Sequence, residues 1–230
     1  MNIGAQLKEI EAGQDLARKA LQLAMLVATV FRERGHEMVV VGGSAIEFYT
    51  DGAYMSGDID LCFWQRPRPS PREIAEIMAQ LDATGSSVRS FKVAGLFVDV
   101  LGAMESLART EPRRVSSDDG SQSVLVAPPE ELLPERLLLA VYPSRNEEAF
   151  ACAKKLAVVC VENRIAMDWD ETMRVAALPA YRVANELAQI DRGGEEREGA
   201  ARDMKNIPII PMDRPITMSD WEAGRAARPG

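Results

Sequence analysis

Histidine is almost absent from this 230-residue sequence, in which His36 is the single example. One histidine cannot build a histidine-rich zinc site, and any serine or cysteine hydrolase would depend on it entirely. Because His36 lies where a helix is expected to give way to a strand, we predict a structural role for it.

Cysteine is also scarce, and its three examples show no CxxC spacing. This usage is typical of buried, reduced thiols in a cytoplasmic protein. The first five residues contain no basic stretch followed by an apolar core, so no signal peptide is expected. The most apolar stretches, 21–31 and 132–142, are too short or too interrupted to span a bilayer. We therefore expect a cytoplasmic location without membrane contact. The cysteines are Cys62, Cys152 and Cys160.

An excess of positive charge is missing too, since the formal net charge is −8. The chain therefore lacks the global basic footprint of a protein that binds duplex nucleic acid, although a locally basic groove remains compatible with an RNA end or a nucleotide. Hydrophobic residues make up 47% of the sequence, which is ordinary for a globular protein and argues against disorder of the whole chain.

Strand and helix patterns alternate in the first half of the chain. Apolar residues recur at helical spacing over 15–34, and Gly35 is expected to end that helix. Only a short turn is expected ahead of residue 15. This alternation predicts an α/β (α+β) fold, in which helices pack against a sheet. Further helices are predicted over 45–49 and from Ser70 to near Gly85, and strands over 38–41, 58–64, 88–93, 96–101 and 123–126.

From Glu130 to about Ile190 the pattern is helical almost throughout, and prolines 134, 143 and 179 are expected to break or bound the helices. After Gly193 the sequence becomes charge-rich and then proline-punctuated, which is typical of an extended tail. We predict three parts: a core at 1–127, a helical domain at 128–192 and a tail at 193–230.

Three features carry chemistry, and the first is the turn Gly42-Gly43-Ser44 between a strand and a helix. Glycines let the backbone approach a ligand closely, and the amides at a helix N-terminus favour a phosphate. Many such turns use Gly-Gly for geometry alone, so that alternative stays open.

The second feature is Asp58-Ile59-Asp60. Residues two apart on a strand point to the same face, so both carboxylates are expected to project together. Two like charges this close repel one another, and a cation between them relieves the repulsion. Hard oxygen ligands suit Mg²⁺ or Mn²⁺. The alternative is an exposed polar strand edge.

The third feature is Asp99, a single carboxylate within the apolar run Leu96 to Leu101. A buried carboxylate without a partner is costly, and a metal shared with Asp58 and Asp60 would supply one. A salt bridge to an arginine is the alternative.

A dinucleotide-binding interpretation fits the sequence less well. The third glycine of G-x-G-x-x-G is missing, because Ile46-Glu47 occupies its place. That motif also places its acid at the end of a strand, whereas Asp58 and Asp60 begin one.

In combination, Gly42-Gly43-Ser44, Asp58-Ile59-Asp60-Leu61 and Phe97-Val98-Asp99-Val100 resemble the nucleotidyltransferase superfamily, typified by DNA polymerase beta and the aminoglycoside nucleotidyltransferases. The closest resemblance is to small prokaryotic members, including those of abortive-infection and toxin–antitoxin systems. The resemblance covers about residues 39–100 and implies a mixed β-sheet nucleotidyltransferase core with flanking helices.

The resemblance also implies transfer of a nucleoside monophosphate from a triphosphate donor to a hydroxyl acceptor, which would be an RNA end, a protein or a small molecule. Asp58, Asp60 and Asp99 would be the catalytic, metal-binding carboxylates for Mg²⁺ or Mn²⁺, and Gly42, Gly43 and Ser44 would hold the triphosphate. Candidates for phosphate contacts are Arg89, Lys92, Lys154 and Lys155, and candidates for base stacking are Tyr49 and Tyr54.

Two alternatives remain at this point. The arginine that many toxin-like relatives carry before the Asp-x-Asp strand is missing from 54–57, and their Lys-Asp pair is missing from 142–148. A catalytically silent module that binds a nucleotide or a partner is therefore the second hypothesis. The third is an interaction protein that binds a partner chain through its helical half or tail.

Overall fold

The computed structural model describes residues 2–50, 52, 56–64, 67–85, 89–161, 165–192 and 216–218. The predicted tail therefore lies outside the described residues, apart from 216–218. The helices are α1 (Ile3–Ala12), α2 (Leu16–Glu33), α3 (Gly42–Tyr49), α4 (Pro71–Ala79), α5 (Pro129–Val141), α6 (Glu147–Val161), α7 (Trp169–Ala176) and α8 (Ala184–Arg192). The strands are β1 (Met38–Val40), β2 (Asp58–Phe63), β3 (Thr84–Gly85), β4 (Ser90–Val93), β5 (Leu96–Ala103), β6 (Arg113–Ser116), β7 (Ser123–Val126) and β8 (Ile216–Thr217).

Among the described residues the strands form one mixed sheet in the order β3-β4-β5-β2-β1-β7-β6-β8. Strand β2 runs antiparallel to β1 and parallel to β5. The expected mixed α/β fold is confirmed. Because β1 and β2 are antiparallel, they do not form the parallel β-α-β unit that a dinucleotide-binding fold requires.

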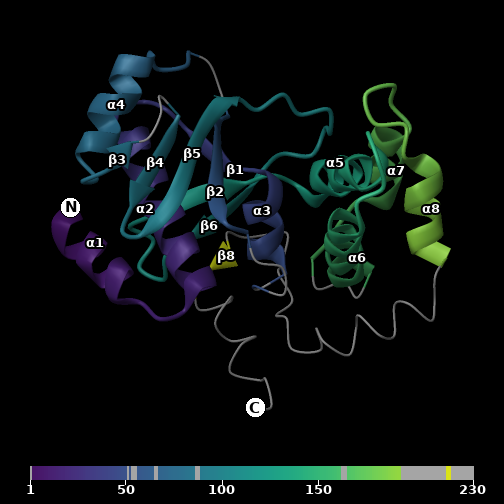
Figure 1. The fold of residues 1–230 in the computed structure, drawn as a ribbon, viewed down its shortest axis with the longest axis horizontal. Coiled ribbons are helices and arrows are strands. Elements are labelled where there is room, and N and C mark those ends of the chain that lie inside the picture. Colours follow the sequence, from purple (N-terminus) through teal and green to yellow (C-terminus); the bar gives the residue numbers. More distant parts are fainter. Residues whose placement is uncertain are drawn as a thin grey trace.

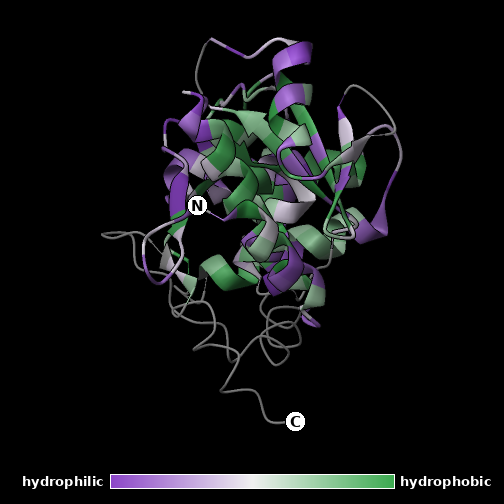
Figure 2. Ribbon diagram, turned by 90° about the vertical axis from the view of Figure 1, so that its left-hand side faces the viewer, coloured by the Kyte–Doolittle hydropathy of each residue, from purple (hydrophilic) through white to green (hydrophobic). Residues whose placement is uncertain are grey.

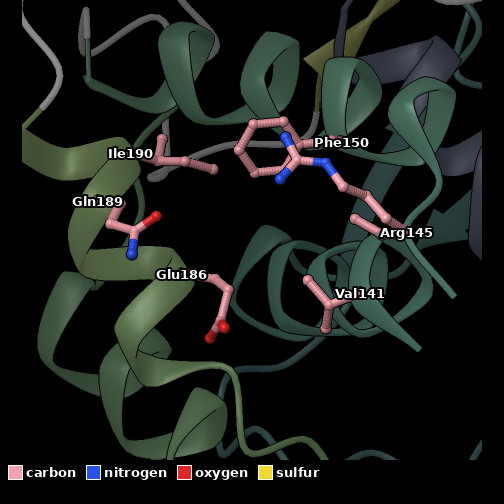
Figure 3. A pocket seen from close by; sticks show the side chains of 7 residues that line it. Val141, Arg145, Phe150, Glu186, Gln189 and Ile190 are labelled. Carbon is pink, nitrogen blue, oxygen red and sulfur yellow. The ribbon is translucent and has the colours of Figure 1, made fainter. Parts of the chain in front are cut away.

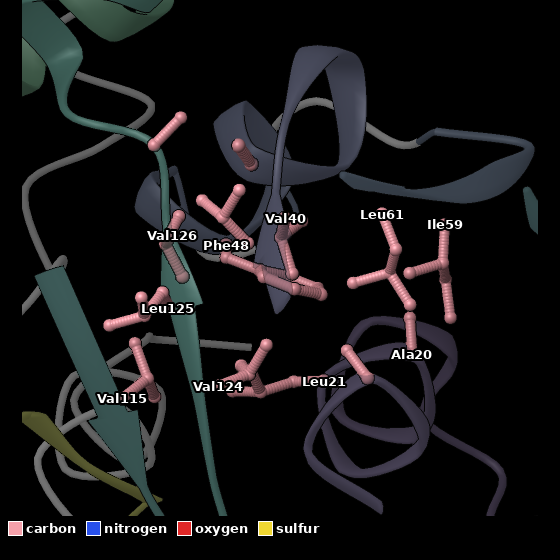
Figure 4. Packing of buried hydrophobic residues seen from close by; sticks show 14 of the residues in the cluster. Ala20, Leu21, Val40, Phe48, Ile59, Leu61, Val115, Val124, Leu125 and Val126 are labelled. Atoms are coloured by element: carbon pink, nitrogen blue, oxygen red, sulfur yellow. The ribbon is translucent and has the colours of Figure 1, made fainter. Parts of the chain in front are cut away.

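The inner face of the sheet is covered by α2, whose residues 23–31 are all buried. This helix begins where the Asp15 side chain accepts a hydrogen bond from the Arg18 amide, as an N-cap does. Figure 4 shows Ile59 and Leu61 of β2 pointing toward Ala20 of α2. Figure 2 shows hydrophobic residues gathered in the interior of the molecule and hydrophilic residues on its outside. The core thus fixes which face of β2 remains open for chemistry.

Helices α5, α6, α7 and α8 gather beside the sheet (Figure 1). The Glu131 carboxylate of α5 accepts hydrogen bonds from the amides of Leu107 and Ala108, in the segment between β5 and β6. Arg113 of β6 donates to the carbonyl of Ala166 beyond α6. These bonds tie the helical half to the sheet. Within the described residues, no helix is both long and apolar enough to cross a membrane.

The structure corrects several expected element boundaries. Residues 3–12 form a full helix instead of a short turn, with Asn2 as its N-cap and Leu7 and Ile10 buried. The predicted helix from Ser70 to near Gly85 ends earlier, at Ala79, because residue 82 takes a positive φ and the chain then enters β3.

The predicted break at Pro134 is wrong, because α5 continues through it. A proline inside a helix removes one backbone hydrogen bond, but Leu133 and Leu137 on either side are fully buried. Their burial holds the helix in place against that loss. Pro143 and Pro179 lie just beyond α5 and α7, as expected.

Candidate metal centre

Three carboxylates meet on the outer face of the sheet. Asp58 and Asp60 lie two residues apart on β2, and Asp60 is directly paired with Asp99 on β5. The intervening Ile59 and Val98 point into the core and are buried. One carboxylate oxygen from each aspartate lies within 4.8 Å of those of the other two. The period of two along a strand and the β2–β5 register together create this cluster.

Asp60 is the electrostatic centre of the cluster. Burial, followed by the neighbouring charges of Asp58 and Asp99, raises the pKa of its carboxyl to about 6, whereas Arg136 opposes the shift. A cation bound among the three carboxylates would reverse this effect, since it favours their charged forms. The donor set consists of hard oxygen ligands, so these residues fit Mg²⁺ or Mn²⁺.

The position of the Asp60 carboxylate requires a glycine at residue 42. Its φ is +61°, a conformation that favours glycine, and a Cβ placed on it would lie 2.9 Å from Oδ2 of Asp60. The first turn of α3 therefore lies directly against the carboxylate cluster. Gly43 follows it as a buried residue of that turn. Backbone amides at this helix start have no partner further back in the helix, which is the geometry that favours an anion.

The Ser44 hydroxyl holds the backbone of the site in place. It is almost fully buried, donates to the carbonyl of Val41 at 3.1 Å and accepts from the amide of Asp60 at 3.1 Å. Val41 in turn donates its amide to the Asp60 carbonyl at 3.0 Å. These bonds join α3 to β2 next to the carboxylates, and they engage the Ser44 hydroxyl within the protein.

Two residues that the sequence patterns did not single out support the start of β2, namely Glu47 of α3 and Ser56 just before the strand. The Ser56 amide donates to the buried Glu47 carboxylate at 2.7 Å, and the Ser56 hydroxyl donates to Asp58 at 3.2 Å. Burial raises the pKa of Glu47, and its hydrogen bond from Ser56 partly offsets this. Glu47 therefore positions the start of β2 from within α3.

Helix α5 supplies two further charged groups that were missed. The positive charge of Arg136 opposes the rise in the pKa of Asp60, as described above, and apolar residues follow Arg136 in the helix. Burial raises the pKa of Glu135; Arg136 opposes this rise, and the carboxylates of Glu131 and Asp60 add to it. A charged pair within the largely apolar run from Leu132 to Val141 is the only sequence signal that could have drawn attention to them. Nothing in the sequence, however, places α5 beside β2.

Several other residues noted in the sequence have structural roles where the structure describes them. Tyr49 is buried beneath Arg113, so packing, and not base stacking, is its role, and Tyr54 lies outside the described residues. His36 is bonded to Glu73 at 3.1 Å, which confirms a structural role. Cys62, Cys152 and Cys160 are buried free thiols, as expected.

A hollow of about 460 Å³ lies between α5, α6 and α8. Figure 3 shows the Arg145 guanidinium beside the Phe150 ring, with Glu186 on the opposite side. The Lys154 ammonium lies 4.6 Å from the centre of the same ring, which is the contact that the structure gives for this phosphate candidate. The hollow begins at Ala140, about 7.5 Å beyond Glu135 along the helix axis.

No family model matches the chain, and no curated protein matches it in sequence. A solved structure, that of an antigenic nucleotidyltransferase-like protein from Paracoccidioides brasiliensis, is similar with a TM-score of 0.52. The two chains are 13% identical, and the match covers 88% of this chain and 95% of the other. At this identity the likeness shows the fold, which is that of a nucleotidyltransferase-like protein.

Two structures of the antibiotic-resistance factor ANT(2″)-Ia are also similar, each at 16% identity. The solution structure has a TM-score of 0.44 and covers 74% of this chain and 94% of that one. The crystal structure, in complex with adenylyl-2″-tobramycin, has a TM-score of 0.41 and covers 69% and 94%. Both TM-scores are lower than that of the Paracoccidioides brasiliensis structure, and no residue's role is transferred from these two structures to this chain.

Proposed function

We propose that this chain is a metal-dependent nucleotidyltransferase, which moves a nucleoside monophosphate from a triphosphate donor to a hydroxyl acceptor. The observation that carries the proposal is the meeting of Asp58, Asp60 and Asp99 within 4.8 Å on one face of the sheet. The start of α3 lies directly against these carboxylates. A cation site and an anion-favouring helix start thus adjoin, which is the pairing that a metal-bound triphosphate needs.

Each group has a distinct role in this proposal. Asp58 and Asp60 hold the donor side of the site, and Asp99 completes it on the acceptor side. Divalent ions bound there would hold the triphosphate and lower the pKa of the acceptor hydroxyl. The backbone amides of Gly42, Gly43 and Ser44 orient the phosphates, while the Ser44 hydroxyl keeps its place between Val41 and Asp60.

The transfer is a single displacement at phosphorus. The acceptor hydroxyl oxygen bonds to the α-phosphorus, and the bond from that phosphorus to the departing pyrophosphate breaks. Pyrophosphate leaves with the electron pair of the broken bond, and Asp99 accepts the hydroxyl proton. Such chemistry depends mainly on positioning and on neutralising charge, so the carboxylates are the essential groups.

We also propose that the chain consists of a core at 1–127, a helical domain at 128–192 and a tail at 193–230. We propose further that it is cytoplasmic and that it is related to the toxin–antitoxin members of the superfamily. The buried free thiols agree with a reducing compartment.

A thermal-shift panel tests the proposal. Each of the four nucleoside triphosphates is added with Mg²⁺, Mn²⁺ or EDTA to the wild type, to Asp60→Ala and to a control. The control is Glu76→Gln, which removes an exposed carboxylate of α4. We expect a metal-dependent rise in Tm with at least one triphosphate, retained in the control and lost in Asp60→Ala, which should stay folded because like-charge repulsion is relieved.

The absence of any metal-dependent shift in the wild type would contradict the proposal. A shift without turnover, when labelled acceptors are then supplied, would instead favour the silent binding module.

A further inference from the structure

The outer face of the sheet carries two rows of side chains that run across β4, β5 and β2. Register pairs Lys92 with Phe97 and Phe97 with Asp58. The next row pairs Asp99 with Asp60. Directly paired residues on neighbouring strands point to the same face. Adjacent strands lie about 4.8 Å apart, so a cation, an aromatic ring and a carboxylate follow one another at this spacing beside the carboxylate cluster.

The Phe97 ring is not part of the core. Phe97 is 53% exposed, whereas its strand neighbour Val98, which points to the inner face, is fully buried. Lys92 is exposed as well. A large ring left in water on a central strand forgoes the stabilisation that burial would give. Its face instead offers a surface on which a planar group can stack.

We propose that Phe97 and Lys92 form the acceptor subsite, and that the acceptor is the 3′ end of a single-stranded polynucleotide. This inference rests on the proposed function, because it names the acceptor of that same site. The terminal base stacks on Phe97, the adjoining phosphate contacts the Lys92 ammonium, and the terminal hydroxyl reaches Asp99. A ring beside a cation is the combination that single-stranded nucleic acids use in their binding sites.

The charge beside Phe97, and not the overall charge of the chain, favours this acceptor. The chain is acidic overall, and its three clustered carboxylates repel a polyanion. Lys92 supplies local positive charge from β4, on the side of β5 away from β2. A polycationic acceptor would meet like charge at Lys92, and a neutral sugar would make no use of it.

Fluorescence anisotropy with a 5′-labelled ten-nucleotide RNA, and with a DNA of the same sequence, tests the inference. We expect Phe97→Ala to weaken binding about 5- to 150-fold, in line with the loss of one stacked base. Phe97→Trp should retain binding. Lys92→Ala should weaken it and reduce the dependence of log K on log salt by about 1. Tighter binding of RNA than of DNA would identify RNA as the acceptor, and the reverse would identify DNA.

Matched controls are Leu139→Ala, which truncates an exposed apolar residue of α5, and Lys8→Ala on α1. Both should bind as the wild type does. Wild-type protein that binds neither strand, or Phe97→Ala that binds as tightly as the wild type, would overturn the inference. The triphosphate shift is measured on the same samples: its presence without polynucleotide binding refutes the acceptor alone, and its absence refutes the proposed function.

Discussion

The Asp60 carboxylate lies directly against the backbone of Gly42, and only a residue without a side chain leaves room for it there. Gly42→Ala would force a Cβ to within 2.9 Å of Oδ2 of Asp60 and would strain a positive φ. We expect this variant to lower the free energy of unfolding by about 2–4 kcal/mol and to abolish the metal-dependent triphosphate shift. Urea unfolding and thermal shift measure the two effects.

Gly120→Ala is the matched control for that experiment. Gly120 has a similar φ of +68°, but a Cβ there would meet nothing within 4 Å. It should therefore show only the backbone cost, about 1–2 kcal/mol. If both variants lose the same stability and both keep the triphosphate shift, then the contact between Gly42 and Asp60 has no part in the site.

The raised pKa of Asp60 predicts a pH dependence in the metal-free protein. Its pKa of about 6 in the folded protein exceeds the ordinary aspartate value of 3.8, so the folded state holds the proton more tightly than the unfolded state. The free energy of unfolding should therefore fall as pH rises from about 4 through 6. The shift corresponds to at most about 3 kcal/mol, and solvent screening of the partly exposed carboxylate reduces this to about 1–2 kcal/mol.

Asp60→Asn should lack this component, so it should be more stable than the wild type near pH 7.5 in EDTA and lose the advantage near pH 4. Urea unfolding of both proteins at several pH values measures the difference. A constant difference between the two proteins across this range would show that Asp60 titrates in the fold as it does in the unfolded chain.

At the residue scale, the sequence predicted which carboxylates would meet but not what surrounds them. The strand period places Asp58 and Asp60 on one face, and an apolar run around Asp99 indicates a need for a partner. The contributions of Glu135 and Arg136 could not be predicted, because α5 is remote in sequence and reaches Asp60 only through the tertiary fold.

At the scale of elements, most strands and helices could be predicted from periodicity, whereas their order in the sheet could not. The parallel neighbours β2 and β5 are separated in the chain by α4, β3 and β4. Strand β6 was missed because its sequence, Arg-Arg-Val-Ser, has only one buried apolar residue. Pairing with β7, and not its own pattern, makes this segment a strand.

A buried polar cluster joins the sheet to the helical half. Arg113 of β6 lies 3.9 Å from the Glu130 carboxylate of α5, and their side chains are 11% and 1% exposed. Glu130 also accepts from the amide of Asp168, at the start of α7. Arg113→Met would leave Glu130 buried without its cation. We expect a loss of about 3–5 kcal/mol in the free energy of unfolding.

Arg72→Met is the control for this element-scale prediction, since it removes an exposed arginine that pairs with Glu76 on α4. It should change stability by no more than about 0.5 kcal/mol. Equal stability of the Arg113 and Arg72 variants in guanidinium unfolding would show that the buried pair does not hold the two halves together.

At the scale of the whole molecule, the fold links this chain to a nucleotidyltransferase-like protein at 13% identity, where no family model or curated sequence matches. Fold alone does not define an activity. The candidate site is assembled from several elements: the sheet provides three carboxylates, α3 provides the helix start beside them, and α5 adds the charges of Glu135 and Arg136.

A Mn²⁺ titration followed by electron paramagnetic resonance tests the metal site most directly, because free and bound Mn²⁺ give distinguishable signals. The wild type should bind Mn²⁺ at the carboxylate cluster and bind it more tightly with the preferred triphosphate present. Asp60→Asn and Asp99→Asn should each weaken binding at least about tenfold, whereas the control Glu76→Gln should not. Binding that is the same in all four proteins would contradict the metal site and, with it, the proposed transferase.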